Sequence, residues 1–165
     1  KEAANYLQDL SYSDDALADF LTTIDELPEK TIVIFWGDHL PSFYSETIAE
    51  TNGSLKMYQT PLLVYPNFAE KSGALGTISP IYFMNHILNT TNAQVTPYYA
   101  LLMELEEALP AFEKGLYIER NSTEVFEKRA DLSEETQELL KVYDTIQYDV
   151  TVGENYSKAF NFFED

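Results

Sequence analysis

The chain has 165 residues, enough for one domain with a real core, and its 45% hydrophobic and 14% aromatic content excludes a disordered polypeptide. Ten basic residues against 28 acidic ones give a net charge of −18, which opposes binding to nucleic acid or to an anionic membrane. Cysteine is absent, which excludes a disulfide framework, and no apolar run reaches the roughly 18 residues of a membrane span, so we expect the chain itself to be soluble.

The N-terminal part of the chain has a helical pattern. Residues 2–10 predict one helix, and Ser13 is placed to cap a second helix that Pro28 ends. Because the first residues already have the pattern of a helix interior, we expect the chain to be a segment of a longer protein.

Two predicted strands follow, separated by a polar stretch. Residues 31–36 are apolar without alternation, which predicts a strand covered on both faces. Residues 61–66 predict a second strand of the same kind. The polar residues between them predict a surface loop with a turn at Asn52-Gly53.

The remaining residues predict three helices and one short strand. Pro80 and Pro97 each begin a predicted helix, and Pro110 closes the second of these. Residues 116–119 predict a short edge strand, and Ser133 caps the last long helix.

This order of elements predicts an α/β layered domain with few strands and flanking helices, one incomplete structural unit over residues 1–165. Two clear strands are few for a parallel sheet, so we expect strands outside the chain to complete it. An open edge or an apolar patch is therefore expected near Asp38 and His39. Self-association with a second copy, or a rearranged terminal segment, would cover that surface.

The strongest candidate for chemistry is Gly37-Asp38-His39, directly after the first predicted strand. In open α/β sheets, ligands bind outside the carboxyl ends of the strands, and glycine permits a tight turn there. A carboxylate beside an imidazole suits a Zn, Mn or Fe ion, although a complete site needs three or four ligands. In the other interpretation, Asp38 and His39 only cap a loop and hydrogen-bond each other's backbone.

The rest of the chain offers few other candidates. His86 is the only other histidine and lies within an apolar predicted helix, where a histidine is most often a packed residue. The sequence has no glycine-rich phosphate loop and no GxSxG motif. No serine or threonine has a recognisable activating neighbour, so we predict no nucleophile in this chain.

The string FWGDHLPSFY resembles the alkaline phosphatase–sulfatase superfamily, and within it the lipoteichoic acid synthase-like phosphoglycerol transferases of Gram-positive bacteria. Further segments are similar to this group in the same order: NYLQDLSYSDDALADFL, YQTPLLVYPN, ISPIYFMNHILN and ETQELLKVYDTIQYDVTVGENYSKAF. GDH alone is a weak signal, whereas the ordered set is fairly specific and covers nearly the whole chain.

The resemblance implies that Asp38 and His39 are the late ligands of one divalent metal ion, Mn by preference, with Zn or Mg as alternatives. The family's early Glu, its nucleophilic Thr and its phosphate-binding His have no counterparts here, and we expect them upstream. In the intact enzyme, the metal-bound Thr would attack the phosphorus of phosphatidylglycerol, and the glycerophosphoryl group would pass to a glycerol hydroxyl or a sugar. The segment alone is then expected to be inactive.

The resemblance places the intact protein, membrane-anchored, at the extracytoplasmic face of a bacterial cell membrane, in the synthesis of lipoteichoic acid or a related glycopolymer. The substrate would be a phosphatidylglycerol-type headgroup, bound through the missing half. Two alternatives remain: a sulfatase or phosphoethanolamine transferase of the same superfamily, and a non-catalytic binding module that kept the fold.

Overall fold

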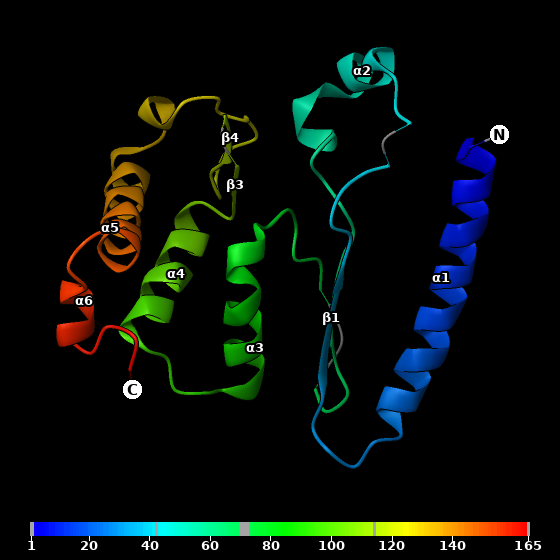
Figure 1. Cartoon of the computed structure of the whole chain (residues 1–165), viewed down its shortest axis with the longest axis horizontal. Coiled ribbons are helices and arrows are strands. Elements are labelled where there is room, and N and C mark those ends of the chain that lie inside the picture. Colours follow the sequence, from blue (N-terminus) through cyan, green and yellow to red (C-terminus); the bar gives the residue numbers. More distant parts are fainter. Residues whose placement is uncertain (1, 42, 70–72, 114, 165) are drawn as a thin grey trace. The chain divides into compact units, whose positions relative to one another are not determined.

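The computed structural model describes residues 2–41, 43–69, 73–113 and 115–164. The chain divides into two compact units, residues 1–73 and 74–165, and each is described by itself (Figure 1). Both units combine helices with a two-stranded sheet, so the predicted α/β class with few strands and flanking helices is confirmed. That both units belong to one domain stays a prediction. Within the described residues, no helix is both long and apolar enough to cross a membrane.

The first unit contains α1 (Glu2–Asp25), β1 (Ile32–Trp36), α2 (Glu46–Lys56) and β2 (Leu62–Pro66). The prediction of two helices before β1 was wrong, because α1 is continuous. Ser13 does not cap a helix; its hydroxyl donates to the Asp9 carbonyl one turn earlier, at 3.0 Å. A serine hydroxyl can bond in this way within a helix, so the same residue is compatible with either structure.

Strands β1 and β2 pair antiparallel, with Ile34 opposite Val64 at the centre of the register, so the expectation of a parallel sheet was wrong for this pair. The expectation that β1 is covered on both faces was wrong for its end, since Phe35 is 41% and Trp36 is 50% exposed. Among the described residues the sheet has only these two strands. The predicted open edge is therefore present within the described residues, Phe35 and Trp36 expose apolar surface near Asp38, and nothing in the structure tests what covers them.

The polar stretch between the strands contains a helix that the sequence pattern did not predict. The Ser45 hydroxyl accepts the backbone N–H of Ile48 and caps α2. Gly53 kinks the helix with a φ of 76°, a left-handed conformation that glycine adopts without strain. The expected turn at Asn52-Gly53 is therefore a break inside α2.

The second unit contains α3 (Phe83–Thr91), α4 (Pro97–Ala108), β3 (Ala111–Glu113), β4 (Leu116–Ile118), α5 (Glu134–Thr151) and α6 (Tyr156–Ala159), with 3₁₀ turns η1 (Pro80–Tyr82) and η2 (Arg129–Asp131). The predicted starts at Pro80, Pro97 and Ser133 are confirmed. The edge strand predicted at residues 116–119 is β4, and its partner β3 was missed.

One hydrophobic cluster organises the second unit. Its buried members come from η1, α4, β4, α5 and the segments between them: Tyr82, Leu102, Leu105, Leu109, Tyr117, Leu132 and Leu140. The Tyr82 hydroxyl donates to the Leu109 carbonyl at 2.9 Å, so the polar end of this ring is satisfied inside the core. The cluster fixes α4 against α5.

The first turn of α5 is held by a side chain from the end of β4. A carboxylate oxygen of Glu119 accepts hydrogen bonds from the Ser133 backbone N–H, the Ser133 hydroxyl and the Thr136 hydroxyl. These bonds hold the pKa of Glu119 below its ordinary value, although partial burial acts in the opposite direction. A negative charge at this position also matches the positive end of the helix dipole.

Removing the side chain at the centre of the cluster should loosen the second unit. Leu105 is 0% exposed, so Leu105→Ala is expected to cost about 2–5 kcal/mol of stability. Leu7 is 63% exposed, and Leu7→Ala should change stability by less than about 0.5 kcal/mol. Hydrogen exchange of the α4 and α5 amides measures the effect of Leu105→Ala, with Leu7→Ala in the first unit as the control, and equal protection in the two variants would contradict the assignment of Leu105 to a core.

Candidate metal centre

Asp38 and His39 follow β1 directly, at the point where the chain turns away from β2. The pairing continues one residue past the strand, since the Gly37 N–H donates to the Pro61 carbonyl at 3.1 Å. A Cβ at Gly37 would lie 3.0 Å from the Cβ of Thr60, closer than side chains normally approach. A side chain at residue 37 would therefore have to displace Thr60, so glycine suits the close contact between these two segments, from which the chain continues to Asp38.

Hydrogen bonds to neighbouring backbone orient both side chains. One Asp38 oxygen, Oδ1, accepts the His39 backbone N–H at 2.9 Å. The Nδ1 atom of His39 lies 2.8 Å from the Leu40 carbonyl oxygen. Because a carbonyl oxygen can only accept, Nδ1 carries the proton and Nε2 keeps its lone pair in the neutral ring.

The two remaining ligand atoms face each other. Asp38 Oδ2 lies 3.5 Å from His39 Nε2, and the side chains are 85% and 77% exposed respectively. Two atoms bound to one Zn or Mn ion, each about 2.1 Å from it, lie about 3–3.5 Å apart. A histidine that binds metal through one nitrogen commonly donates from the other to a carbonyl, as His39 does to Leu40. This donor set fits half of a divalent site.

The loop-capping interpretation accounts for one of these contacts, the bond between Asp38 Oδ1 and the His39 backbone N–H. The metal interpretation uses the other carboxylate oxygen of Asp38, Oδ2. Among the described residues, no group of three or more His, Cys, Asp or Glu side chains gathers in a way that could hold an ion. The role of Asp38 and His39 as metal ligands therefore stays a prediction.

His86 lies on α3 and contacts a buried carboxylate of α4. Its Nε2 is 2.9 Å from Glu106 Oε1, while Asn85 donates to the other Glu106 oxygen at 2.8 Å. Asn85 is 0% and Glu106 7% exposed, so the predicted packed position for His86 is confirmed. The sequence pattern did not identify Glu106 as its partner, although an acid within the apolar face of a helix is a usable signal.

Glu106 remains ionised because its hydrogen bonds outweigh its burial. Burial raises the pKa of this carboxyl, but the bonds from His86 and Asn85, together with the nearby His86 and Arg120, hold the pKa below its ordinary value. The Arg120 guanidinium also donates to the Glu106 backbone carbonyl, at 3.2 Å. This network joins α3, α4 and Arg120, the second residue after β4.

The sequence model of the family described as Sulfatase matches residues 1–93, which include Asp38 and His39. A protein of Rhizobium meliloti (strain 1021), named "Putative cyclic beta-1,2-glucan modification protein", is 27% identical over 169 residues. That match covers 93% of this chain and 26% of the relative.

A solved structure is also similar to the chain: Streptococcus pyogenes phosphoglycerol transferase GacH in complex with sn-glycerol-1-phosphate. The TM-score is 0.74 at 25% identity, and the match covers 94% of this chain and 36% of the other. The chain therefore spans about a quarter of the curated relative and about a third of the solved one.

The Glu106 network should make stability depend on pH. Since the folded-state pKa of Glu106 lies below the ordinary value of 4.5, its contribution is present above that pH and is lost as pH falls through the folded pKa. Melting temperature measured from pH 7 downwards should therefore fall more steeply below about pH 4.5 in the wild type than in Glu106→Gln. Parallel curves for the two proteins would show that this carboxylate contributes nothing to the pH dependence.

Proposed function

Because the chain belongs to the sulfatase family, we propose that it supplies Asp38 and His39 to the metal centre of an extracytoplasmic, metal-dependent phosphoglycerol transferase. The observation that carries the proposal is the pair itself. Asp38 Oδ2 and His39 Nε2 face each other at 3.5 Å, while the other polar atom of each side chain is held by backbone. The ion is proposed to be Mn, with Zn or Mg as alternatives.

The similar solved structure supports the choice of substrate. That transferase was solved in complex with sn-glycerol-1-phosphate, the kind of group that a phosphatidylglycerol headgroup would deliver. The name of the Rhizobium relative refers to a glucan, which favours a sugar polymer as acceptor. We propose that the protein transfers phosphoglycerol from such a lipid, at the outer face of a bacterial membrane, to lipoteichoic acid or a related glycopolymer.

The chemistry that a bound ion supplies is to lower the pKa of the attacking hydroxyl and to offset charge on the phosphoryl oxygens. Asp38 would contribute one negative charge to the ion. His39 would contribute a neutral ring, fixed by the Leu40 carbonyl in the tautomer with an open Nε2. The nucleophile and the remaining ligands are proposed to lie outside this chain, which would then be inactive alone.

A sulfatase is the second candidate function, because the matching family is described by that name. The same Asp-His pair would serve either reaction, since both transfer a group with an anionic tetrahedral centre. The whole protein distinguishes the two when it is offered phosphatidylglycerol and an aryl sulfate in parallel. Release of diacylglycerol without sulfate release supports the transferase.

Metal binding to this chain should be weak and should need both side chains. Mn²⁺ titration followed by NMR is expected to broaden the amides of residues 37–40 first, because two ligands leave most of the coordination sphere to water. Asp38→Asn or His39→Gln should each remove most of the effect, while the matched variants Asp14→Asn and His86→Gln should retain it. If tight metal binding persists in both Asp38→Asn and His39→Gln, these two residues are not the ligands.

In the whole protein, His39→Gln should lower phosphatidylglycerol-dependent turnover by about a hundredfold or more, since it removes a metal ligand. His86→Gln should stay within a few-fold of the wild type, because His86 contacts Glu106 within a packed network. Diacylglycerol release measures both. Comparable losses from the two variants would refute the assignment of His39 as the functional histidine.

A further inference from the structure

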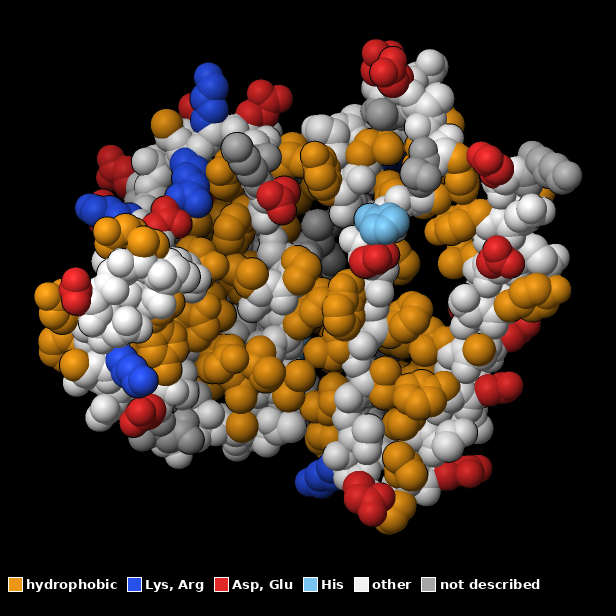
Figure 2. All heavy atoms as spheres, viewed as in Figure 1, with side chains coloured by type: hydrophobic (Ala, Val, Ile, Leu, Met, Phe, Trp, Pro, Cys, Tyr) orange, Lys and Arg blue, Asp and Glu red, His pale blue; other side chains and the backbone are white. Residues whose placement is uncertain are grey.

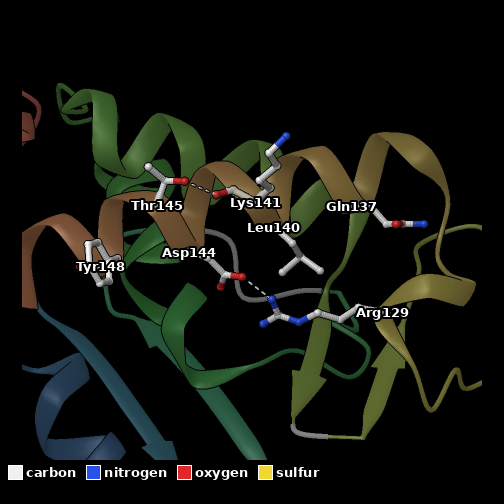
Figure 3. Close-up of a pocket in the computed structure, with 7 residues that line it drawn as sticks. All are labelled: Arg129, Gln137, Leu140, Lys141, Asp144, Thr145 and Tyr148. Carbon is white, nitrogen blue, oxygen red and sulfur yellow. Dashed lines mark hydrogen bonds and ion pairs between the residues drawn. The ribbon is translucent and has the colours of Figure 1, made fainter. Parts of the chain in front are cut away.

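The second unit has a surface pocket of about 440 Å³ between η2 and one face of α5 (Figure 3). Arg129 of η2 reaches across to Asp144 of α5, and the two side chains form an ion pair. Tyr148 follows Asp144 by one helical turn and is 64% exposed. Leu140 also lines the pocket but is 1% exposed, so it offers a ligand little apolar surface. A solvent-exposed aromatic ring thus lies beside the ion pair of Arg129 and Asp144.

The positive charges of the pocket already have negative partners. Arg129 is paired with Asp144, and the Lys141 ammonium lies 3.6 Å from a Glu138 carboxylate oxygen. Figure 2 shows basic side chains gathered with acidic ones around η2 and the start of α5. A phosphate would therefore meet guanidinium and ammonium groups whose charges are offset, with the Asp144 carboxylate beside them. The charges of the pocket therefore do not favour binding of an anion over binding of a neutral ligand.

The pocket offers both donors and acceptors of hydrogen bonds. The Arg129 guanidinium carries five N–H donors, more than Asp144 and Tyr117 can use. Gln137 donates from its amide nitrogen to the Leu132 carbonyl at 2.7 Å, which orients its side-chain oxygen as an acceptor. Thr145 donates to the Lys141 carbonyl at 2.7 Å, and its oxygen can still accept. A ligand with several hydroxyl groups, each able to donate and accept, matches this set.

We propose that this pocket binds a neutral saccharide, whose C–H face would lie on the Tyr148 ring and whose hydroxyls would bond to Arg129 and Asp144. Tyrosine suits this role because it combines a broad apolar face with few rotatable bonds. The pocket would hold part of a sugar-polymer acceptor, so the inference rests on the function proposed above. It adds the place on the second unit where a sugar unit would bind and the residues that would recognise it.

The test uses the 165-residue chain and four-unit glucose oligosaccharides with β-1,2, β-1,3 and β-1,4 linkages. NMR titration is expected to shift resonances between residues 129 and 148 with at least one of them. Tyr148→Ala should weaken that binding about three- to tenfold, while Tyr148→Phe retains it. Tyr58 is 66% exposed and lies in the first unit, so Tyr58→Ala is the matched control and should change nothing.

A second variant tests the charge argument. Asp144→Asn keeps the size of the side chain but leaves Arg129 without its counter-charge, so the pocket should lose saccharide affinity and gain affinity for sn-glycerol-1-phosphate. The proposal is overturned if no oligosaccharide shifts these resonances, if Tyr148→Ala and Tyr58→Ala behave alike, or if sn-glycerol-1-phosphate binds the wild-type pocket as well as the sugar does. Neither metal nor turnover enters the test, so this inference and the proposed transferase activity can fail separately.

Discussion

The antiparallel pairing of β1 with β2 is the interaction on which the proposed metal centre depends. It continues beyond β1 through the Gly37 N–H and the Pro61 carbonyl, and a side chain at residue 37 would have to displace Thr60. The chain consequently leaves the sheet at a fixed residue. Asp38 and His39 then take their orientation from backbone groups within the same turn, so strand pairing sets their position and local hydrogen bonds set their direction.

The second unit depends on a different kind of contact, the burial of polar groups that satisfy one another. Glu106 would be costly inside α4 without Asn85 and His86, and these two side chains would lack partners without Glu106. The side-chain amide oxygen of Asn85, Oδ1, is the exception, since it is buried with no hydrogen-bond partner among the described residues. A network of this kind favours one register of α3 on α4, because any other register would leave more such groups unpaired.

The features that the sequence predicted correctly are those with local causes. Pro80, Pro97 and Ser133 begin helices because a fixed ring or a capping hydroxyl acts within one turn. Helix α2 was missed because Gly53 and polar residues resemble a loop, although the Ser45 cap was a usable signal. The Leu40 carbonyl was missed because a backbone contact leaves no periodic pattern, whereas Glu106 was missed although an acid within the apolar face of a helix was a usable signal. The metal role of Asp38 and His39 was predicted from residue type and position, and it stays a proposal.

The buried residues are unevenly distributed between the two units. Within the described residues of the first unit only Ile24 and Pro66 are buried, whereas the second unit has a continuous hydrophobic cluster. The proposed metal pair therefore lies on the part of the chain with the smaller core. By mass action, an ion that binds only the folded form multiplies the ratio of folded to unfolded first unit by one plus the ion concentration divided by its dissociation constant. The proposed ion would then stabilise the part of the chain with the smaller core, in addition to any part it has in catalysis.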